Sequence, residues 1–260
     1  FRQIRQRLLP IAIGTDNPSD QASRAGKFSN YLLYAVGEIL LVVIGILIAI
    51  QVDNWNTKRS ENQILLNYYQ KINGELSLVS VELQDIQKSI DTLIILNKKS
   101  LHILNLKNKD SLVHLKESIG ALGTAFTANL TFPILDEFLG QGSLSKIEKD
   151  SLKLGFQYFK IGFDDVKELD SYISDQYSTS IEPYFYKNIN YANVVFGNYD
   201  ELVKGGPETD YSKFYDNLEL YNLVTFKLEV LIAQQNRLAR LQRVLDFLQE
   251  KIEVYLDQKN

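Results

Sequence analysis

Few side chains in this sequence are placed to carry out chemistry. His102 and His114 are the only histidines, and they are too far apart in sequence to be two metal ligands on one helix turn. The acidic pairs at 136–137 and 164–165 are direct neighbours, and direct neighbours on a helix do not face each other. We therefore expect histidines that face solvent or cap a helix, acidic pairs that are solvated surface, and a chain that is not an enzyme.

Motifs and composition exclude several further classes. The phosphate-binding patterns G-x-x-x-x-G-K-[ST] and G-x-G-x-x-G and the hydrolase pattern G-x-S-x-G do not occur. Cysteine is absent, which excludes disulfides, thiolate zinc sites, iron–sulfur clusters and cysteine nucleophiles. With 28 Lys and Arg against 32 Asp and Glu, the chain has no basic excess for nucleic acid. The sequence predicts no cofactor, no metal site and no nucleic-acid partner.

Residues 31–52 are long and apolar enough to cross a membrane, with the sequence YLLYAVGEILLVVIGILIAIQV. As a helix this stretch would be roughly 33 Å long, and the hydrocarbon core of a bilayer is about 30 Å thick. A cleaved signal peptide is the alternative, but its apolar region usually has about 7 to 15 residues and ends at a cleavage site. Here the helical pattern continues through residues 53–56, which favours an uncleaved signal anchor that spans the membrane once.

Charged and aromatic residues beside the span predict its orientation. Basic residues are more frequent before it (Arg2, Arg5, Arg7, Arg24 and Lys27) than after it (Lys58, Arg59 and Lys71). Because basic residues concentrate on the cytoplasmic side, we expect residues 1–30 in the cytoplasm, the span in a bacterial inner membrane, and residues 53–260 in the periplasm. Tyr31 and Tyr34 at one end and Trp55 at the other are expected to anchor the span at the two interfaces.

The predicted cytoplasmic segment has two parts. In residues 1–11 apolar residues alternate with arginines, a pattern that fits either a short amphipathic helix on the membrane surface or an unstructured positive anchor. Residues 14–20 are rich in Gly, Asn, Asp and Pro and predict a polar loop. Methionine is absent even at position 1, so we expect that Phe1 is not the translated start.

Glu38 is the residue of the span that is most costly to place in lipid. It lies about seven residues in, roughly 10 Å below the interface, so it needs a partner or a proton. On a helix it shares one face with Gly45, Ala49 and Val52, and the small residues Gly45 and Ala49 permit close backbone approach. We predict that this face, the Glu38 face, contacts another membrane helix. The alternatives are a Glu38 that reaches the interface or stays protonated without function, and, with weaker support, a proton path.

Three long amphipathic patterns predict that residues 53–260 form an all-α domain. Their apolar residues recur in steps of three and four. The first stripe is Leu65, Tyr68, Ile72, Leu76, Val79, Leu83, Ile86, Ile90 and Leu93; the second is Leu152, Phe156, Phe159, Phe163, Val166, Ile173 and Tyr177; the third is Leu238, Leu241, Leu245, Leu248, Ile252 and Tyr255. Because each stripe must be buried against another, we expect an antiparallel bundle in which the last helix returns along the first.

The first long helix is expected to continue from the span or to break at residues 53–56. It should end at a polar turn at 107–110, where Asp110 or Ser111 would cap a short helix. The glycines and the proline in residues 120–142 predict short helices joined by turns.

The second and third helices have weaker boundary signals. Ser145 and Glu148 form a capping-box pattern that would open the second helix, and Pro183 would end or kink it. Short helices and a loop are expected at 184–221, and the last helix is predicted from about Ser212 to Asp257.

A concentration of aromatic residues is the most distinctive composition of this domain. It comprises Tyr172, Tyr177, Tyr184, Phe185, Tyr186, Tyr191, Phe196, Tyr199, Tyr211, Phe214 and Tyr215. Tyrosine has an apolar face and a polar tip, which suits both helix junctions and a binding site for sugar or protein. We expect junction packing to account for most of these residues, and this region to be the first place to look for a ligand.

The block from Glu38 to Ala49, followed by Gln51 and by residues 54–56 (Asn-Trp-Asn), carries a family resemblance. It resembles a large Bacteroidota family of single-pass membrane-anchored proteins of unknown function, and residues 142–144 with Ile147 are similar to a weaker later block of that family. The first block is specific, whereas the rest of the chain matches mainly in length and helical character. The resemblance implies a lineage and a place in the cell envelope, and it implies no activity.

The same resemblance implies candidate sites for O-glycosylation. Bacteroidota proteins outside the cytoplasm are often modified at Asp followed by Ser or Thr and then an aliphatic residue. Three positions fit this pattern, namely Ser111, Ser151 and Thr92. Ser111, in a predicted exposed turn, is the strongest candidate, and Thr92, in the middle of a helix, is the weakest.

Taken together, these features favour a non-enzymatic accessory or scaffold subunit of a bacterial inner-membrane or envelope complex. It would dock through the Glu38 face on another integral membrane protein, or on copies of itself, and project its helical domain into the periplasm. One alternative is a periplasmic sensory or ligand-binding module that signals through a partner. A homo-oligomeric channel has less support, because one acidic residue in one span offers no relay.

Overall fold

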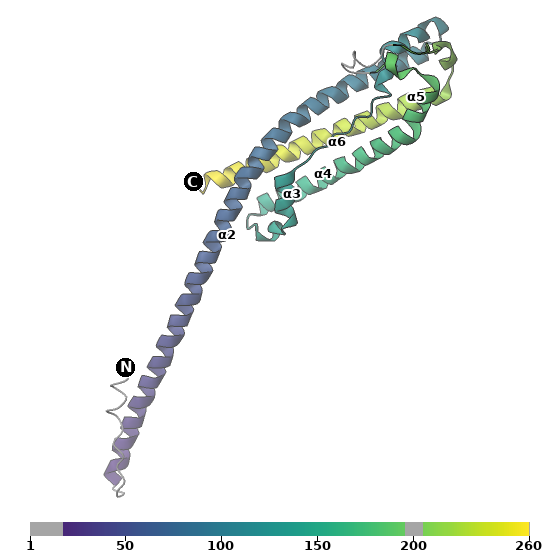
Figure 1. Ribbon diagram of the computed structural model, residues 1–260. Coiled ribbons are helices and arrows are strands. Elements are labelled where there is room, and N and C mark those ends of the chain that lie inside the picture. Colours follow the sequence, from purple (N-terminus) through teal and green to yellow (C-terminus); the bar gives the residue numbers. More distant parts are fainter. Residues whose placement is uncertain (1–17, 196–204, 260) are drawn as a thin grey trace. The chain divides into compact units, whose positions relative to one another are not determined.

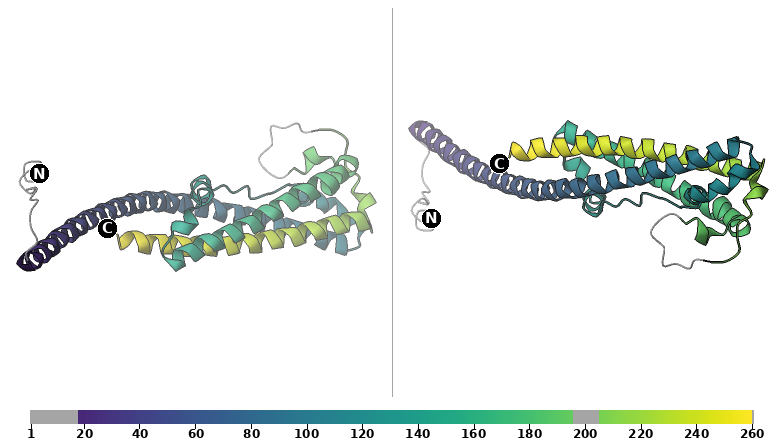
Figure 2. Two further views of the ribbon diagram at one scale, coloured as in Figure 1. Left: turned by 90° about the horizontal axis from the view of Figure 1, so that it is seen from below. Right: turned by 90° about the horizontal axis from the view of Figure 1, so that it is seen from above.

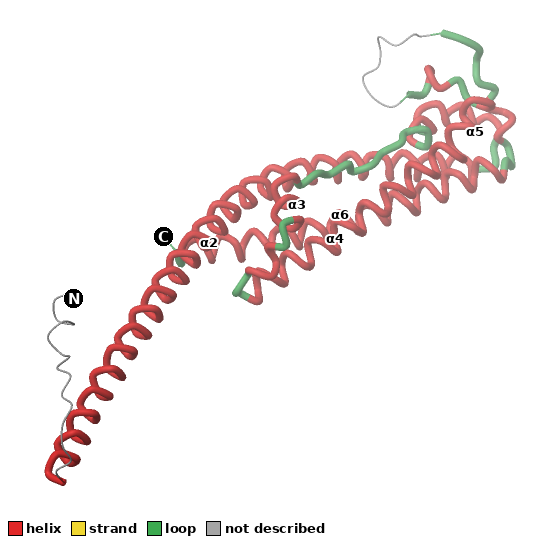
Figure 3. The backbone as a smooth tube through the Cα atoms, turned by 60° about the horizontal axis from the view of Figure 1, so that its bottom comes forward, coloured by secondary structure: helices red, strands yellow, loops and turns green. Residues whose placement is uncertain are grey.

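Helices make up all the regular structure that is described. The computed structural model of the protein describes the backbone of residues 18–195 and 205–259, with side chains from Leu32 onward. Within these ranges the elements are α-helices, 3-10 helices and one π-helical turn, and no strand is found among them (Figure 3). The predicted all-α class is therefore confirmed. The helix or anchor predicted for residues 1–11 lies outside the described residues.

Helix α2 runs from Pro18 to Asn105 and contains the whole predicted span (Figure 1). Its backbone stays helical through residues 53–56, where the sequence allowed a break. The loop predicted at 14–20 is wrong for residues 18–20, which form the first turn of α2. A helix accepts proline in its first turn because the missing N–H has no intrahelical partner there. The chain divides into two compact units, Phe1–Ile64 and Leu65–Asn260.

In the second unit residues 65–105 of α2 lie beside α4 (Asp150–Gln176) and α6 (Leu218–Asp257) (Figure 2). Helix α6 runs antiparallel to α2, since Gln249 Nε2 donates to Ser77 Oγ (2.9 Å) and Gln242 Nε2 donates to Ser80 Oγ (2.6 Å). The predicted return of the last helix along the first is confirmed. Helix α4 runs in the same direction as α2, a detail that the stripes did not predict.

Two large apolar cores and one small cluster (Leu169, Ile173 and Val230) hold the bundle together. Every residue of the three predicted stripes is buried or half-buried, so the seams are confirmed. The main core lies between the three long helices and includes the rings of Tyr69, Phe132 and Phe156. The second, which we call the distal core, comprises Ile103, Leu112, Leu115, Ile119, Leu122, Ile181, Tyr184, Phe185, Ile189, Val194, Phe214, Leu220 and Val224.

Glycines let α4 approach α6 closely. A Cβ on Gly162 would lie 3.5 Å from Leu241 Cδ1, an ordinary contact, whereas one on Gly155 would lie 3.0 Å from Leu248 Cδ1. We expect Gly162→Ala to raise the free energy of unfolding by about 0.5–1 kcal/mol, because alanine loses less backbone entropy in a helix. Gly155→Ala should raise the free energy of unfolding by less, because the new Cβ would crowd Leu248 and force its side chain to shift. Urea unfolding of both variants tests this, and a destabilised Gly162→Ala would contradict it.

The turn after α2 differs from the prediction in its capping residue. Lys107 adopts a positive φ of 46°, which ends the helical path. Asn108, and not Asp110 or Ser111, caps the next element, since its side chain accepts from the Asp110 N–H at 2.9 Å. That element is a 3-10 helix, Lys109–Glu117. Asparagine is as good an N-cap as aspartate or serine, so the cap lies earlier in the chain than predicted.

The predicted start of the second long helix is also wrong. The Ser145 hydroxyl donates back to Gly142 O at 2.8 Å, within the 3-10 helix Ser143–Lys146, and α4 begins only at Asp150. At its other end α4 continues through a π-helical turn, Tyr177–Ile181, into α5 (Glu182–Asn188). Pro183 lies in the first turn of α5. Because proline has no N–H, the carbonyl group four residues earlier, at position 179, receives no hydrogen bond from it. That position lies within the π-helical turn, so the helix changes its hydrogen-bond pattern where an end or a kink was predicted.

The last long helix, α6, starts at Leu218 and not near Ser212. Asp216 has a positive φ of 49°, and the Asn217 side chain caps α6 by accepting from the Leu220 N–H at 2.8 Å. Residues Tyr211–Phe214 form a separate 3-10 helix. Its cap is Asp210, whose carboxylate accepts from the Ser212 N–H at 3.0 Å.

The short helices predicted for residues 120–142 are present as the 3-10 helix Ile119–Ala121 and α3 (Pro133–Gly140), but residues 124–132 between them are extended along the bundle, and we call them the strap (Figure 3). The strap leads from the distal core to α3 and returns the chain to the beginning of α4. Because no strand pairs with it in the described structure, side chains of the long helices take its backbone hydrogen bonds.

Four helix side chains hold the strap and the start of α3. Lys227 Nζ donates to Thr124 O (2.9 Å) and Gln234 Nε2 to Phe126 O (3.1 Å). Asp170 of α4 accepts from the N–H groups of residues 128 and 129 at 3.0 and 3.1 Å. Glu75 of α2 accepts from residues 134 and 135 at 2.8 and 3.0 Å, which satisfies free N–H groups at the start of α3.

Candidate functional site

The N-terminal unit exposes an apolar surface that water does not favour. Within the described residues, a single helix is long and apolar enough to cross a membrane; its most apolar 18-residue window has a mean hydropathy of 2.7 and none of it is buried. The Leu, Ile and Val side chains of residues 32–52 are 42–71% exposed. Contiguous apolar surface of this size marks contact with lipid or with another protein. Such a helix can serve as a membrane anchor.

The Glu38 face lies on continuous helix and is open. At about 100° per residue, Gly45, Ala49 and Val52 all fall within about 40° of the Glu38 direction. A Cβ added to Gly45 would meet nothing within 4 Å, so a second backbone can approach there. The structure therefore places these four predicted residues on one surface.

The predicted interface anchors are exposed where they are described. Tyr34 is 81% and Trp55 62% exposed, and the Arg59 guanidinium lies 5.6 Å from the Trp55 ring centre. This cation–π pair joins residues four apart on α2. The side chain of Tyr31 lies outside the described residues.

The candidate glycosylation residues differ in accessibility. Ser111 is half-buried in the 3-10 helix Lys109–Glu117, where an exposed turn had been predicted. Ser151 is exposed in the first turn of α4. Thr92 is exposed in α2, and its hydroxyl donates to Lys88 O at 3.1 Å. Ser151 and Thr92 are therefore the exposed candidates, and Ser111 is the less accessible one.

The histidines and acidic pairs form no reactive cluster. His102 is exposed, and His114 Nδ1 lies 3.2 Å from Glu117 Oε1 on the surface. Asp165 differs from the predicted solvated surface, because it lies 3.3 Å from Arg237 of α6. Glu137 likewise accepts from the Tyr68 hydroxyl at 2.7 Å. Throughout the described ranges, no group of three His, Cys, Asp or Glu side chains could hold a metal ion.

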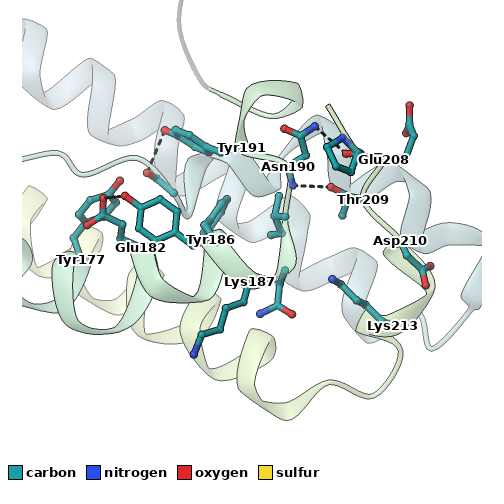
Figure 4. A pocket seen from close by; sticks show the side chains of 15 residues that line it. Tyr177, Glu182, Tyr186, Lys187, Asn190, Tyr191, Glu208, Thr209, Asp210 and Lys213 are labelled. Atoms are coloured by element: carbon teal, nitrogen blue, oxygen red, sulfur yellow. Dashed lines mark hydrogen bonds between the residues drawn. The ribbon is translucent and has the colours of Figure 1, made fainter. Parts of the chain in front are cut away.

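A pocket of about 690 Å³ opens beside the distal core, and we call it the distal pocket (Figure 4). It is lined by Gly123, Tyr177, residues of α5, residues 189–191, residues 207–210 and Lys213. Its volume falls in the range of small-molecule sites, about 300–1,000 Å³. The distal pocket thus lies in the aromatic-rich region, which the sequence analysis named as the first place to look for a ligand.

Asn190 ties together the two loops that form one wall of the pocket. Its N–H donates to Thr209 Oγ1 (2.9 Å), and its side-chain amide donates to Gly205 O (3.0 Å) and Pro207 O (2.9 Å). Gly205 and Gly206 have φ values of 138° and 92°, which other residues rarely adopt. These contacts fix the wall in place before any ligand binds.

Aromatic side chains form the opposite part of the pocket. The rings of Phe185 and Tyr191 meet edge to face at 5.5 Å, and a Cβ on Gly123 would lie 2.9 Å from both rings. The Tyr186 hydroxyl donates to Glu182 Oε1 at 2.6 Å, and this hydrogen bond raises the pKa of Tyr186. Burial raises the pKa of Tyr177.

The aromatic residues of this region therefore have two roles. Tyr184, Phe185 and Phe214 are buried in the distal core, which accounts for junction packing. The side chains of Tyr172, Tyr186, Tyr191 and Tyr215 are exposed, and Tyr186 is 80% exposed. Tyr177 and Tyr211 are half-buried against the distal core. Phe196 and Tyr199 lie outside the described residues.

Polar residues within the α6 stripe were missed by the sequence analysis. Lys227 is 2% and Gln234 1% exposed, and both lie where the stripe of α6 extends toward its start. The signal was present, because the spacing of three and four continues from Leu238 back through Gln234, Leu231 and Lys227. Burial of Glu75 could not be read in this way, since its partners are N–H groups at the start of α3, about 60 residues away in the sequence.

Comparison of the chain with protein-family models, with curated proteins and with solved structures found no match. The resemblance at residues 38–56 therefore remains a prediction. Function has to be argued from the exposed apolar helix and the distal pocket themselves.

Proposed function

We propose that this chain is a single-pass inner-membrane protein that acts as a non-enzymatic accessory or scaffold subunit of an envelope complex. The observation that carries the proposal is the continuous apolar surface of residues 32–52, none of which is buried. Each apolar side chain left in water costs about 1.5–3 kcal/mol relative to a buried one, so this surface favours a surrounding of lipid and partner helices over water.

The proposed topology follows from charge. Five basic residues before the span and three after it favour a cytoplasmic N-terminus. The helical bundle then lies in the periplasm, where a chain without cysteine needs no disulfides and is stabilised by its two apolar cores. The resemblance to membrane-anchored Bacteroidota proteins agrees with this location.

The Glu38 face is the proposed docking surface. A carboxyl group below the interface is stabilised by a polar partner, and Gly45 and Ala49 allow that partner's backbone to come close. The bundle offers no reactive cluster in its described part, so its proposed contribution is to bind and position other proteins.

Site-specific photo-crosslinking tests the docking surface. A photoreactive residue at Ala49 should give crosslinks to a second membrane protein, while one at Leu47, about 180° around the helix, should give few. Glu38→Gln should weaken the Ala49 crosslinks. Equal crosslinking from both positions would contradict a defined face, and intact crosslinks in Glu38→Gln with a loss of ion flux would favour the channel.

A second candidate function is a ligand-binding or sensory module. The distal pocket favours it, because its wall is held by hydrogen bonds and its volume suits a small ligand. In this case the membrane span transmits the bound state to a partner. Both candidates use the same anchor and differ in whether the bundle binds a small molecule.

A further inference from the structure

We propose that the distal pocket binds an uncharged carbohydrate. The inference deepens the second candidate function and rests on it. Two observations support it: an exposed tyrosine ring is held in a fixed orientation at the cavity, and carboxylate acceptors and ammonium donors line the same cavity (Figure 4).

Tyr186 provides an aromatic side chain that is largely exposed at the distal pocket. Its side chain is 80% exposed, on a helix where most large apolar groups turn inward. The hydrogen bond from its hydroxyl to Glu182, four residues earlier, fixes the ring direction. A sugar ring has a face of C–H bonds that packs on such a ring, and a fixed ring loses little entropy when it binds.

The charged groups of the pocket suit hydroxyl groups. Three carboxylates, Glu182, Glu208 and Asp210, and two ammonium groups, Lys187 and Lys213, line it, which gives a net charge of minus one. Carboxylates accept and ammonium groups donate hydrogen bonds, and a hydroxyl group can do both. A polyhydroxyl ligand can therefore satisfy both kinds of group at once.

Other ligand classes fit the pocket less well. Phosphates and nucleotides are anions, and in this pocket they would meet three carboxylates against two ammonium groups, without an arginine fork to bind them in bidentate fashion. A lipid needs an enclosed apolar cavity. Phe185 and Ile189 line the distal pocket, but both are already buried in the distal core and offer little apolar surface to a ligand. An extended peptide would pair with the edge of a sheet, and the described chain offers no strand.

Calorimetric titration of the full chain in lipid nanodiscs tests the proposal. Nanodiscs are needed because maltoside detergents carry a sugar headgroup. The probes are cellotetraose, maltotetraose, mannotetraose and chitotetraose, with tetragalacturonate as the charged counterpart. At least one neutral probe should bind saturably, and Tyr186→Ala should weaken it about five- to tenfold, the effect of one lost aromatic contact.

Tyr172→Ala is the matched control, because Tyr172 is an exposed tyrosine outside the pocket. It should leave the affinity unchanged. No saturable binding of any neutral probe at millimolar concentration, tighter binding of tetragalacturonate, or equal losses in both variants would each overturn the proposal. None of these results would affect the membrane docking proposed above, which is measured by the crosslinks at Ala49.

Discussion

Replacing Glu75 with alanine is expected to lower the free energy of unfolding of the bundle by about 3 kcal/mol. Glu75 is 8% exposed, and its two carboxylate oxygens accept the N–H groups of Ile134 and Leu135. Without the carboxylate these donors are left unsatisfied at the start of α3, at about 1–3 kcal/mol each. Urea unfolding of the full chain in micelles, followed by near-ultraviolet circular dichroism, measures the loss.

Two further variants make the Glu75 experiment specific. Glu75→Gln keeps one acceptor oxygen and should lose about half as much stability. Glu82→Ala removes an exposed glutamate one heptad further along α2 and should change stability by less than about 0.5 kcal/mol. Equal effects of Glu75→Ala and Glu82→Ala would show that the strap and α3 do not depend on this carboxylate.

Replacing Lys227 with methionine is expected to stabilise the bundle by about 2 kcal/mol at pH 7. Lys227 is 2% exposed, its one hydrogen bond goes to Thr124 O, and burial lowers its pKa to about 8. At pH 7 the folded state therefore bears the cost of a buried ammonium group. Methionine fills the same volume without the charge, although it gives up the hydrogen bond to the strap.

The pH dependence of stability shows whether Lys227→Met stabilises the bundle by removing a buried charge or by improving the packing. Between pH 8 and 10 the unfolded chain keeps the Lys227 proton that the folded chain has lost, so the free energy of unfolding rises with pH in this window. Lys227→Met should remove that rise, while Lys160→Met, at an exposed position, should keep it. The measurements should end near pH 10. Burial raises the pKa values of Tyr69 and Tyr184, so above that pH the unfolded chain loses tyrosine protons that the folded chain keeps, and the free energy of unfolding falls. A wild-type free energy of unfolding that does not change with pH in this window would contradict the prediction.

The sequence predicted the long helices well because burial of a stripe is a periodic signal. Steps of three and four from Leu65 to Leu93 and from Leu238 to Tyr255 correspond to buried faces in the structure. Their ends were predicted less well, because Asn108 and Asn217 compete with other capping residues nearby. The strap could not be predicted, since its conformation depends on side chains that are distant in sequence, such as Asp170 and Gln234.

The candidate sites were predictable to different degrees. The Glu38 face follows from helical periodicity alone, and the helix is present as expected. The aromatic composition indicated the region of the distal pocket but not the cavity. Its wall depends on hydrogen bonds from Asn190 to Gly205 and Pro207, which lie 15 and 17 residues later in the chain, and no local pattern encodes such contacts.

The central claim is that this chain is an accessory subunit anchored beside another membrane protein. Purification of the full chain from its native membrane in mild detergent, followed by mass and composition analysis of the purified particle, tests it most directly. We expect a second integral membrane protein in stoichiometric amount, and we expect it to be lost or depleted when Glu38 is replaced by glutamine. A lone monomer or a pure homo-oligomer would contradict it.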